Sequence, residues 1–249
     1  MGKDPSLDEL WSSAKPSDET FDPTKVTVPA QGARQYLEHA IARGTRLATA
    51  VKLRMHGNIK LHGWYPFEAE EVIQWHRGFI WCATVKMHWL SICGRDCFVH
   101  GLGEMRWKLF GVVPLVNASG PDVTHSAAGR MNVECIWLPS VLAYRDVSWS
   151  DSDPSHPKAS FSAHAETSDL TIAIAEKGRL VVSINMPRWG NPGGAPLGYY
   201  NFGGIVEEEG TFAGYTIPTH MRVGWHFGTE RFETEGEFFR VVIDDAIYL

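Results

Sequence analysis

Residues 117–142 read NASGPDVTHSAAGRMNVECIWLPSVL, and this segment decides how the rest of the chain is arranged. Its pattern predicts one helix that is apolar nearly all round, interrupted by two charged residues, Arg130 and Glu134. At about 100° per residue these two lie on the same face as Val123, Trp137 and Val141. A charged pair on an apolar helix face either forms an ion pair in the interior or faces a cavity.

The expected helix has recognisable ends. Asp122 follows Gly120-Pro121 and is expected as the N-cap. Pro139 ends the helix, because the residue before a proline avoids the α region. Gly129, in the interior, costs about 1 kcal/mol relative to alanine, so its presence predicts close approach of a strand or a ligand.

Outside this segment, most of the chain alternates between apolar and polar residues with the period of a strand. The first such stretch buries Val51, Leu53 and Met55 on one face. The expected strands are 51–62, 79–90, 97–100, 105–113, 145–150, 159–165, 170–176, 180–187, 198–209, 217–227 and 238–248. Short strands separated by turn signals indicate antiparallel hairpins, and therefore a barrel, a half-barrel or a sandwich.

A few other segments break the strand pattern. Residues 31–44 are expected to form a helix that Gly44 ends, and residues 64–78 a short helix that begins near Pro66. Gly94-Arg-Asp96 is expected as a tight turn. Residues 1–28 are expected to be a flexible N-terminal arm with a short helix around Leu7–Trp11, and residues 29–249 a single domain.

The composition excludes several classes of partner. The chain has 249 residues and a formal net charge of −6, without a cluster of Lys and Arg, which argues against nucleic acid. It has no apolar run long enough to span a bilayer and no secretory signal, so we expect a cytoplasmic protein without membrane insertion. The four cysteines lack metal-knuckle spacing and are expected as free thiols. The oligomeric state stays open, a homodimer included.

The charged pair on the central helix has three interpretations. It can be an interior ion pair that fixes the helix on the sheet. Alternatively, Glu134 carries protons in an apolar pocket while Arg130 acts as an electrostatic clamp. In the third interpretation, Arg130 holds a carboxylate or another oxygen of an apolar ligand.

Aromatic residues are abundant, with 10 Trp and 12 Phe, and they suit the walls of a pocket. Polar residues embedded among them are further candidates for ligand binding. The candidate ligand-binding residues are Trp137, His88, Trp81, Arg188, Tyr200, Trp225 and His226.

The sequence lacks the motifs of common catalytic centres. It has no HExxH pair, no GxSxG nucleophile elbow and no phosphate-binding glycine loop. We therefore expect no cofactor and no metal. The eleven histidines leave one alternative open, because residues from different strands can converge on a metal without any spacing signal.

Several of these residues also resemble a known family. They are Pro29–Ile41, Gly78-Phe-Ile-Trp81, Gly94-Arg-Asp96, Gly101-x-Gly103-x-Met105, Gly120-Pro121 and Arg130-x-x-x-Glu134-x-x-Trp137-x-Pro139. Together they resemble an uncharacterised bacterial family with a central Arg-Tyr-Leu-x-Glu-x-x-Trp-Phe-Pro signature, from about Val28 to the end of the chain. Met131-Asn132 replaces the Tyr-Leu of that signature, and Leu138 stands where Phe is usual.

The resemblance implies an α+β fold: a single antiparallel β half-barrel or open barrel with a long helix packed in its concave face, similar to lipoprotein-carrier half-barrels. It implies no established activity. Our first hypothesis is an aromatic-lined cavity for a small, mostly apolar molecule on which Glu134 and Arg130 perform cofactor-free acid–base chemistry. Such an enzyme would be an isomerase, cyclase or hydratase/dehydratase, of the lyase or isomerase kind used in secondary metabolism. The alternatives are a non-catalytic carrier or sensor of a lipid, terpenoid or polyketide-like ligand, and a structural domain with a filled core.

Overall fold

The computed structural model describes residues 5–25, 30–144, 146–150, 153–175 and 180–249. Within these ranges the strands form a single antiparallel sheet of 13 strands, in the order β6-β5-β4-β3-β2-β1-β13-β12-β11-β10-β9-β8-β7. The sheet is open, because its end strands β6 and β7 do not pair with each other. The expected antiparallel open sheet with few helices is therefore confirmed.

The strands are β1 (Ala50–Lys60), β2 (Trp64–Gln74), β3 (Gly78–Met87), β4 (Leu90–Val99), β5 (Leu102–Leu109), β6 (Val113–Ser119), β7 (Ser148–Ser150), β8 (Lys158–Ala163), β9 (Glu166–Ile174), β10 (Val181–Gly190), β11 (Gly198–Phe212), β12 (Tyr215–Trp225) and β13 (Glu237–Tyr248). The helices are α1 (Leu7–Ser12), α2 (Gln31–Ala40) and α3 (Pro121–Val133), with short helical turns at Pro23–Lys25, Glu134–Trp137, Pro139–Ala143, Pro192–Gly194 and Phe232–Gly236.

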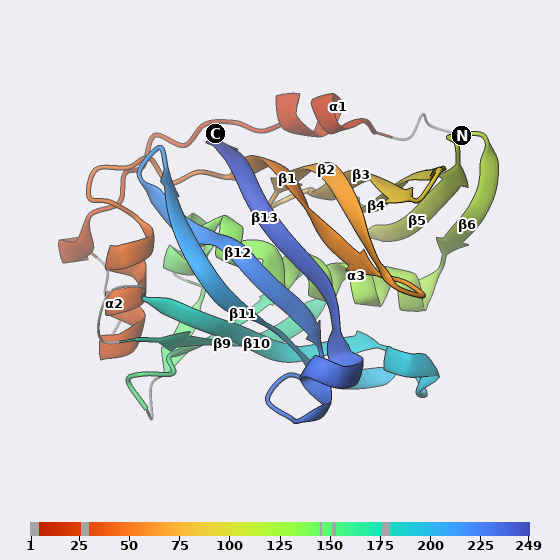
Figure 1. Cartoon of the computed structure of the whole chain (residues 1–249). Coiled ribbons are helices and arrows are strands. Elements are labelled where there is room, and N and C mark those ends of the chain that lie inside the picture. The colour runs from red at the N-terminus through yellow and green to blue at the C-terminus, as the bar shows by residue number, and fades with distance from the viewer. Residues whose placement is uncertain (1–4, 26–29, 145, 151–152, 176–179) are drawn as a thin grey trace.

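The chain builds the sheet as two meanders. Strands β1 to β6 run outward to one edge, and β7 to β13 run inward from the other edge until β13 pairs with β1. The connection from β6 to β7 must therefore travel from one edge of the sheet to the other, and α3 lies on this path. Figure 1 shows the strands curving around α3, which occupies the inner side of the sheet.

The segment from 117 to 142 is not one long helix. Its first residues complete β6, which pairs with β5, and α3 ends at Val133 before two short 3-10 turns. Leu138 leaves the helical region, with φ −131° and ψ 63°, because it precedes Pro139. Asp122 is not the N-cap: Gly120 takes that position, and Asp122 lies in the first turn, where a carboxylate suits the helix dipole.

The prediction of a short helix over residues 64–78 was wrong. This segment is β2, which pairs along its length with β1 and β3. Its three glutamates and one alanine favour a helix locally, but Phe67, Ala69 and Ile73 are buried on alternate positions, the period of a strand. Pairing on both sides overrides the local preference.

The prediction of a tight turn at residues 94–96 was also wrong, because these residues lie in the middle of β4. Gly94 pairs with Ala83 on one side and Trp107 on the other. A Cβ at Gly94 would lie 2.1 Å from the Trp107 ring, so this glycine admits an aromatic ring rather than a turn. The turn lies instead at His88, which has a φ of 55°. The strand expected over 105–113 likewise ends at Leu109.

The N-terminal residues that the structure describes contact the sheet. The short helix expected near Leu7–Trp11 is α1, and its Leu10 packs against Val72, Ile80 and Cys97 on the face opposite the main core. This part of the arm is therefore bound to the sheet. Residues 1–4, 26–29, 145, 151–152 and 176–179, which include both ends of the expected arm and one end each of the expected strands 145–150 and 170–176, lie outside the described residues. The division into an arm and one domain stays a prediction.

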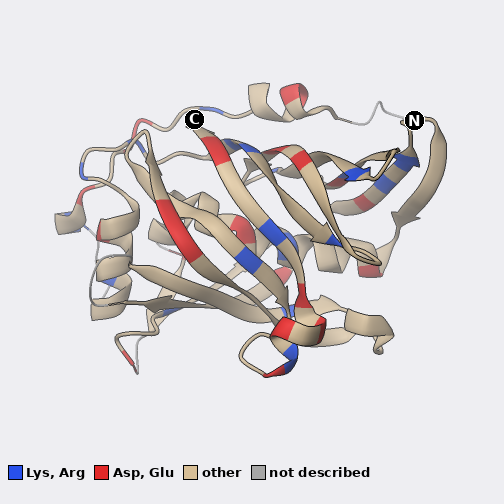
Figure 2. Ribbon diagram, viewed as in Figure 1, with Lys and Arg blue, Asp and Glu red and all other residues tan. Residues whose placement is uncertain are grey.

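The main core lies between α3, α2 and the concave face of the sheet. It includes Tyr36 and Leu37 of α2, Leu53 of β1, Met131 of α3 and Leu138. α2 ends at Ala40, earlier than the expected Gly44. In the described ranges no helix is both long and apolar enough to cross a bilayer. Basic and acidic residues are interspersed along the strands (Figure 2).

Candidate functional site

A cavity of about 490 Å³ lies between α3 and the concave face of the sheet. The α3 side contributes Val123, Ala127 and Arg130, which recur at the spacing of one helix face. The opposite walls are largely aromatic and aliphatic. They include Phe79, Trp81, Phe202, Met221, Val223, Trp225, Phe238 and Phe239.

Six of the residues predicted from the sequence line this cavity. They are Trp81, Arg130, Glu134, Trp137, Arg188 and Trp225. Glu134 and Trp137 lie in the turn that follows α3, so the helix face predicted from the sequence does face the cavity. Trp137 is anchored there by donating from Nε1 to the Pro218 carbonyl at 3.1 Å.

The other three predicted ligand-binding residues lie elsewhere. His88 occupies the β3–β4 turn, where its ring meets Tyr65 edge-on at 6.1 Å. The Tyr200 hydroxyl donates to the Pro196 carbonyl at 2.7 Å, and His226 packs beside Tyr200. None of these three residues lines the cavity, and their role in ligand binding stays a prediction. His88 and His226 follow the ends of β3 and β12, where the chain turns with φ of 55° and 58°.

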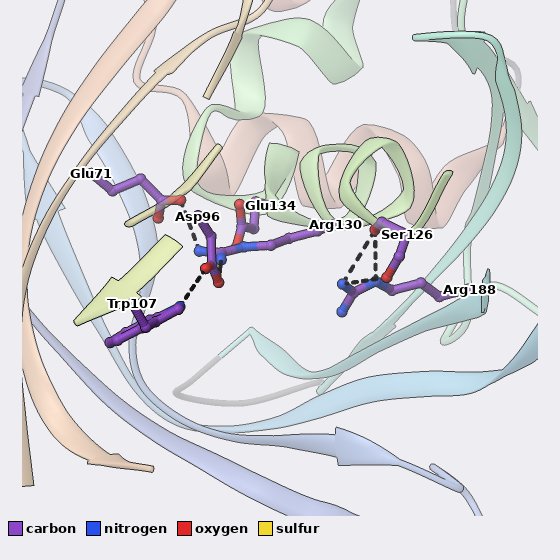
Figure 3. Close-up of polar contacts among 7 residues, drawn as sticks. All are labelled: Glu71, Asp96, Trp107, Ser126, Arg130, Glu134 and Arg188. Atoms are coloured by element: carbon purple, nitrogen blue, oxygen red, sulfur yellow. Dashed lines mark hydrogen bonds and ion pairs between the residues drawn. The ribbon is translucent and has the colours of Figure 1, made fainter. Parts of the chain in front are cut away.

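Arg130 is the centre of a buried ionic cluster (Figure 3). Its Nε donates to Glu134 Oε1 at 2.7 Å, its Nη2 to Glu71 Oε1 at 3.0 Å and its Nη1 to Asp96 Oδ2 at 3.4 Å. The guanidinium carbon lies 4.7 Å from the Phe79 ring centroid and 5.1 Å from that of Trp81. All three nitrogens of Arg130 are therefore already engaged with carboxylates.

The sheet register brings the two remaining carboxylates to Arg130. Glu71 of β2 pairs with Trp81 of β3, and Trp81 pairs with Asp96 of β4, so the three side chains form one row on the concave face. Asp96 also accepts from Trp107 Nε1 at 2.9 Å. Sequence reasoning missed Glu71 and Asp96, because their segments were taken for a helix and a turn. Reading residues 67–73 with a period of two would have placed Glu71 on a buried face.

The cluster holds more acid than base, and burial makes this costly. The Glu71 side chain is 0% exposed, and those of Glu134 and Asp96 are 11% and 18% exposed. Burial, together with the nearby Glu134 carboxylate and a hydrogen bond between the two carboxyl groups, raises the pKa of Glu71 well above its ordinary value. Burial also raises the pKa of Asp96, although Arg130 opposes this.

Glu71 and Glu134 each have one buried carboxyl oxygen, Oε2, that lacks a hydrogen-bond partner. One proton held on Glu71 and donated to Glu134 satisfies both groups, in the way that paired carboxyls share a proton. We therefore treat Glu71 as the protonated member of the pair. Arg130 then faces one neutral carboxyl group among its three acidic partners.

A second arginine, Arg188 of β10, reaches the cavity from the other side of α3 (Figure 3). Its Nε and Nη2 donate to the Ser126 carbonyl at 3.3 and 3.2 Å, and its Nη2 lies 3.4 Å from Ser126 Oγ. A Cβ at Gly129 would lie 3.1 Å from Arg188 Cγ, so the glycine lets the Arg188 side chain pass close to α3.

The cluster has no obvious metal-binding geometry. Among the residues with described positions, no group of three or more His, Cys, Asp or Glu could hold a metal ion. The four cysteines are free thiols, of which Cys97 and Cys135 are buried.

Residues 28–248 match the DUF6920 family, which is described as a family of unknown function. The chain belongs to this family. Its match covers the same stretch as the resemblance drawn from the sequence, while the signature motif itself stays a prediction. No curated protein sequence matches the chain.

Two crystal structures are similar to this member of the DUF6920 family. One is a LolA superfamily protein from Nitrosomonas europaea, with 8% identity, a TM-score of 0.45, and coverage of 90% of this chain and 94% of that chain. The other is a domain assigned as an outer membrane lipoprotein-sorting protein from Vibrio parahaemolyticus, with 7% identity, a TM-score of 0.41, and coverage of 91% and 93%. These TM-scores are too low to transfer a ligand or a function.

Proposed function

We propose that this chain binds a small, mostly apolar molecule in the cavity under α3, as a non-catalytic carrier or sensor. The observation that supports this is a cavity of about 490 Å³ whose walls away from α3 are largely aromatic and aliphatic, with Asp96, Glu104, Arg188 and Asn191 among the few polar residues. Ligand pockets typically measure about 300–1,000 Å³ and combine such walls with a few polar groups. A lipid chain, a terpenoid or a polyketide-like molecule suits these walls.

The geometry supports a carrier or sensor over an acid–base enzyme. A proton carrier must come within about 3.2 Å of the reacting atom, directly or through a water. Glu134 Oε1 is bound to Arg130, and Glu134 Oε2 is fully buried, so neither oxygen is presented freely to a ligand. Each of the three nitrogens of Arg130 already donates to an acidic side chain, so Arg130 offers no free pair of nitrogens to clamp a substrate.

The cavity volume also distinguishes this proposal from a purely structural domain. A filled core leaves few voids larger than a water molecule. The space under α3 is far larger than that, and large residues such as Phe239 and Trp225 border it without closing it.

Uptake of the neutral fluorescent dye N-phenylnaphthylamine tests this proposal. We expect the dye to brighten with the wild-type protein and to be displaced by apolar molecules. Ala127→Phe places a ring into the cavity from α3 and should abolish most of the signal. Ala42→Phe adds the same ring at an exposed position outside the cavity and is the matched control.

Native mass spectrometry of protein purified from cells is the second measurement. A retained small molecule that is present in wild type and absent from folded Ala127→Phe supports the carrier or sensor. The proposal fails if wild-type protein binds no dye, or if folded Ala127→Phe binds it as well as wild type does.

A further inference from the structure

Arg188 differs from Arg130 in the groups that neutralise its positive charge. Arg130 has three carboxylates within 4 Å, whereas no carboxylate of the described residues lies within that distance of Arg188. Its protein acceptors are the carbonyl and hydroxyl oxygens of Ser126, both uncharged. The guanidinium is otherwise packed over rings, 4.6 Å from the Phe202 centroid and 5.3 Å from that of Trp225.

One nitrogen of Arg188 is unused. Nε and Nη2 both point at Ser126, but Nη1 donates to no described residue. Nη1 is also not one of the fully buried polar atoms that lack a partner, so it faces accessible space in the cavity that Arg188 lines. The orientation is fixed, because Ser126 holds one side of the fork and the rings of Phe202 and Trp225 hold its plane.

A buried cation without an anion is costly, and Arg188 has a further penalty. Burial and the like charge of Arg130 both lower the pKa of Arg188, while Asp96 and Glu134 attract it from beyond ion-pair distance. An anionic oxygen group placed at Nη1 would form a charge-assisted hydrogen bond and lower this penalty.

Building on the function proposed above, we propose that the ligand is an acidic amphiphile, and that Arg188 binds its carboxylate or phosphate oxygens. The apolar part of the ligand then lies along Phe238, Phe239, Met221 and Val223. Arg130, the charged residue that the sequence points to first, is the framework of the site, whereas Arg188 is the contact with the ligand.

The wild-type protein tests this through four ligands that share one chain: dodecanoate, dodecyl phosphate, dodecanol and dodecylamine. The affinity of each ligand is measured by its displacement of N-phenylnaphthylamine from the cavity. A charge-assisted hydrogen bond predicts that at least one of the two anions binds about tenfold or more tightly than the alcohol. The better anion tells a carboxylate ligand from a phosphate ligand. The amine should bind more weakly than the alcohol.

Arg188→Met removes the charge and keeps an apolar stem, and Arg231→Gln is the control. Arg231 pairs with Glu235 at the surface and does not line the cavity, so its variant changes the net charge equally. We expect Arg188→Met to lose the preference for anions while its affinity for dodecanol stays within about twofold. Arg188→Lys, which retains a cation, should retain part of the preference. Arg231→Gln should match wild type.

The outcomes separate this inference from the function on which it rests. Wild-type protein that binds dodecanol or dodecylamine as tightly as the anions overturns the role of Arg188 and leaves the carrier intact. An anion preference that survives in folded Arg188→Met overturns it as well. If Arg188→Met does not fold, the comparison of the four ligands with wild type and Arg188→Lys still decides. Wild-type protein that binds neither the dye nor any of the four ligands refutes the carrier itself.

Discussion

Replacing Glu71 by glutamine tests the protonation of the buried cluster directly. In the cluster, Glu71 Oε1 accepts from Arg130 at 3.0 Å, and the side chain is completely buried. Glutamine has the shape of a protonated glutamic acid: its oxygen can accept from Arg130, and its amide can donate to Glu134. If Glu71 is protonated in the native state, Glu71→Gln therefore removes a titration without removing a hydrogen bond.

The magnitude follows from the raised pKa of Glu71. Above the unfolded pKa of about 4.3, the unfolded state has lost its proton while the native state keeps it. The free energy of unfolding of wild type then falls by about 1.4 kcal/mol for each pH unit, until the pH passes the native pKa. Glutamine does not titrate. The stability of Glu71→Gln relative to wild type should therefore rise with pH by up to that slope.

Urea denaturation of both proteins between about pH 5 and 8 measures this difference. Glu68→Gln is the matched control, because Glu68 lies on the same strand, is 72% exposed and pairs with Lys86. Its effect should stay within about 0.5 kcal/mol over the whole range. A Glu71→Gln protein that is less stable than wild type by a constant ~3 kcal/mol at every pH would show that Glu71 is ionised and serves as a partner of Arg130.

Three further predictions concern the stability of the folded chain. Arg130→Met leaves buried carboxylates without a cation and should lower the free energy of unfolding by about 3–5 kcal/mol at neutral pH, with a smaller loss in acid, by urea denaturation. His164 follows β8 and packs against the rings of Trp75 and Phe98, and burial lowers its pKa to about 4, so wild type should lose up to ~1.4 kcal/mol per pH unit as the pH falls from about 6.5 toward that value. His164→Phe should lack this loss, and an unchanged acid profile would contradict the assignment. Gly103→Val places a Cβ 2.7 Å from the Val123 carbonyl oxygen and should cost about 1–3 kcal/mol, seen as a lower melting temperature; an unchanged value would mean that β5 and α3 separate freely.

The strands could be predicted because their signal is local. Alternation with a period of two survives in any sheet with one buried face, so the segments around Leu53, Ile172 and Val241 were identified from their own residues. The segment from Trp64 to Gln74 was not, since its glutamates and alanine favour a helix in isolation. What overrides that preference is pairing with β1 and β3, and this depends on residues distant in the sequence.

The residues of the candidate site also fall into a group that the sequence predicts and a group that only the structure shows. Arg130, Glu134 and Trp137 share one face at helical spacing, which a sequence reveals. Glu71 and Asp96 reach them through strand register, for which the sequence offers no direct signal.

Adjacency to a tryptophan was a poor guide to the cavity. Arg188 lines it while its neighbour Trp189 does not, and Trp225 lines it while His226 does not. Arg188 and Trp189 are neighbours within β10 and point to opposite faces of the sheet, whereas His226 lies beyond the end of β12.

The sequence by itself determined that this chain forms an antiparallel sheet with a charged pair on an apolar helical segment, because both features depend on periods of two to four residues. Only the tertiary structure decided which charges meet. The path of α3 from one edge of the sheet to the other places Arg130 against three acidic side chains, while no acidic side chain of the described residues pairs with Arg188. Which charges pair therefore depends on contacts across the sheet rather than on neighbours in the chain.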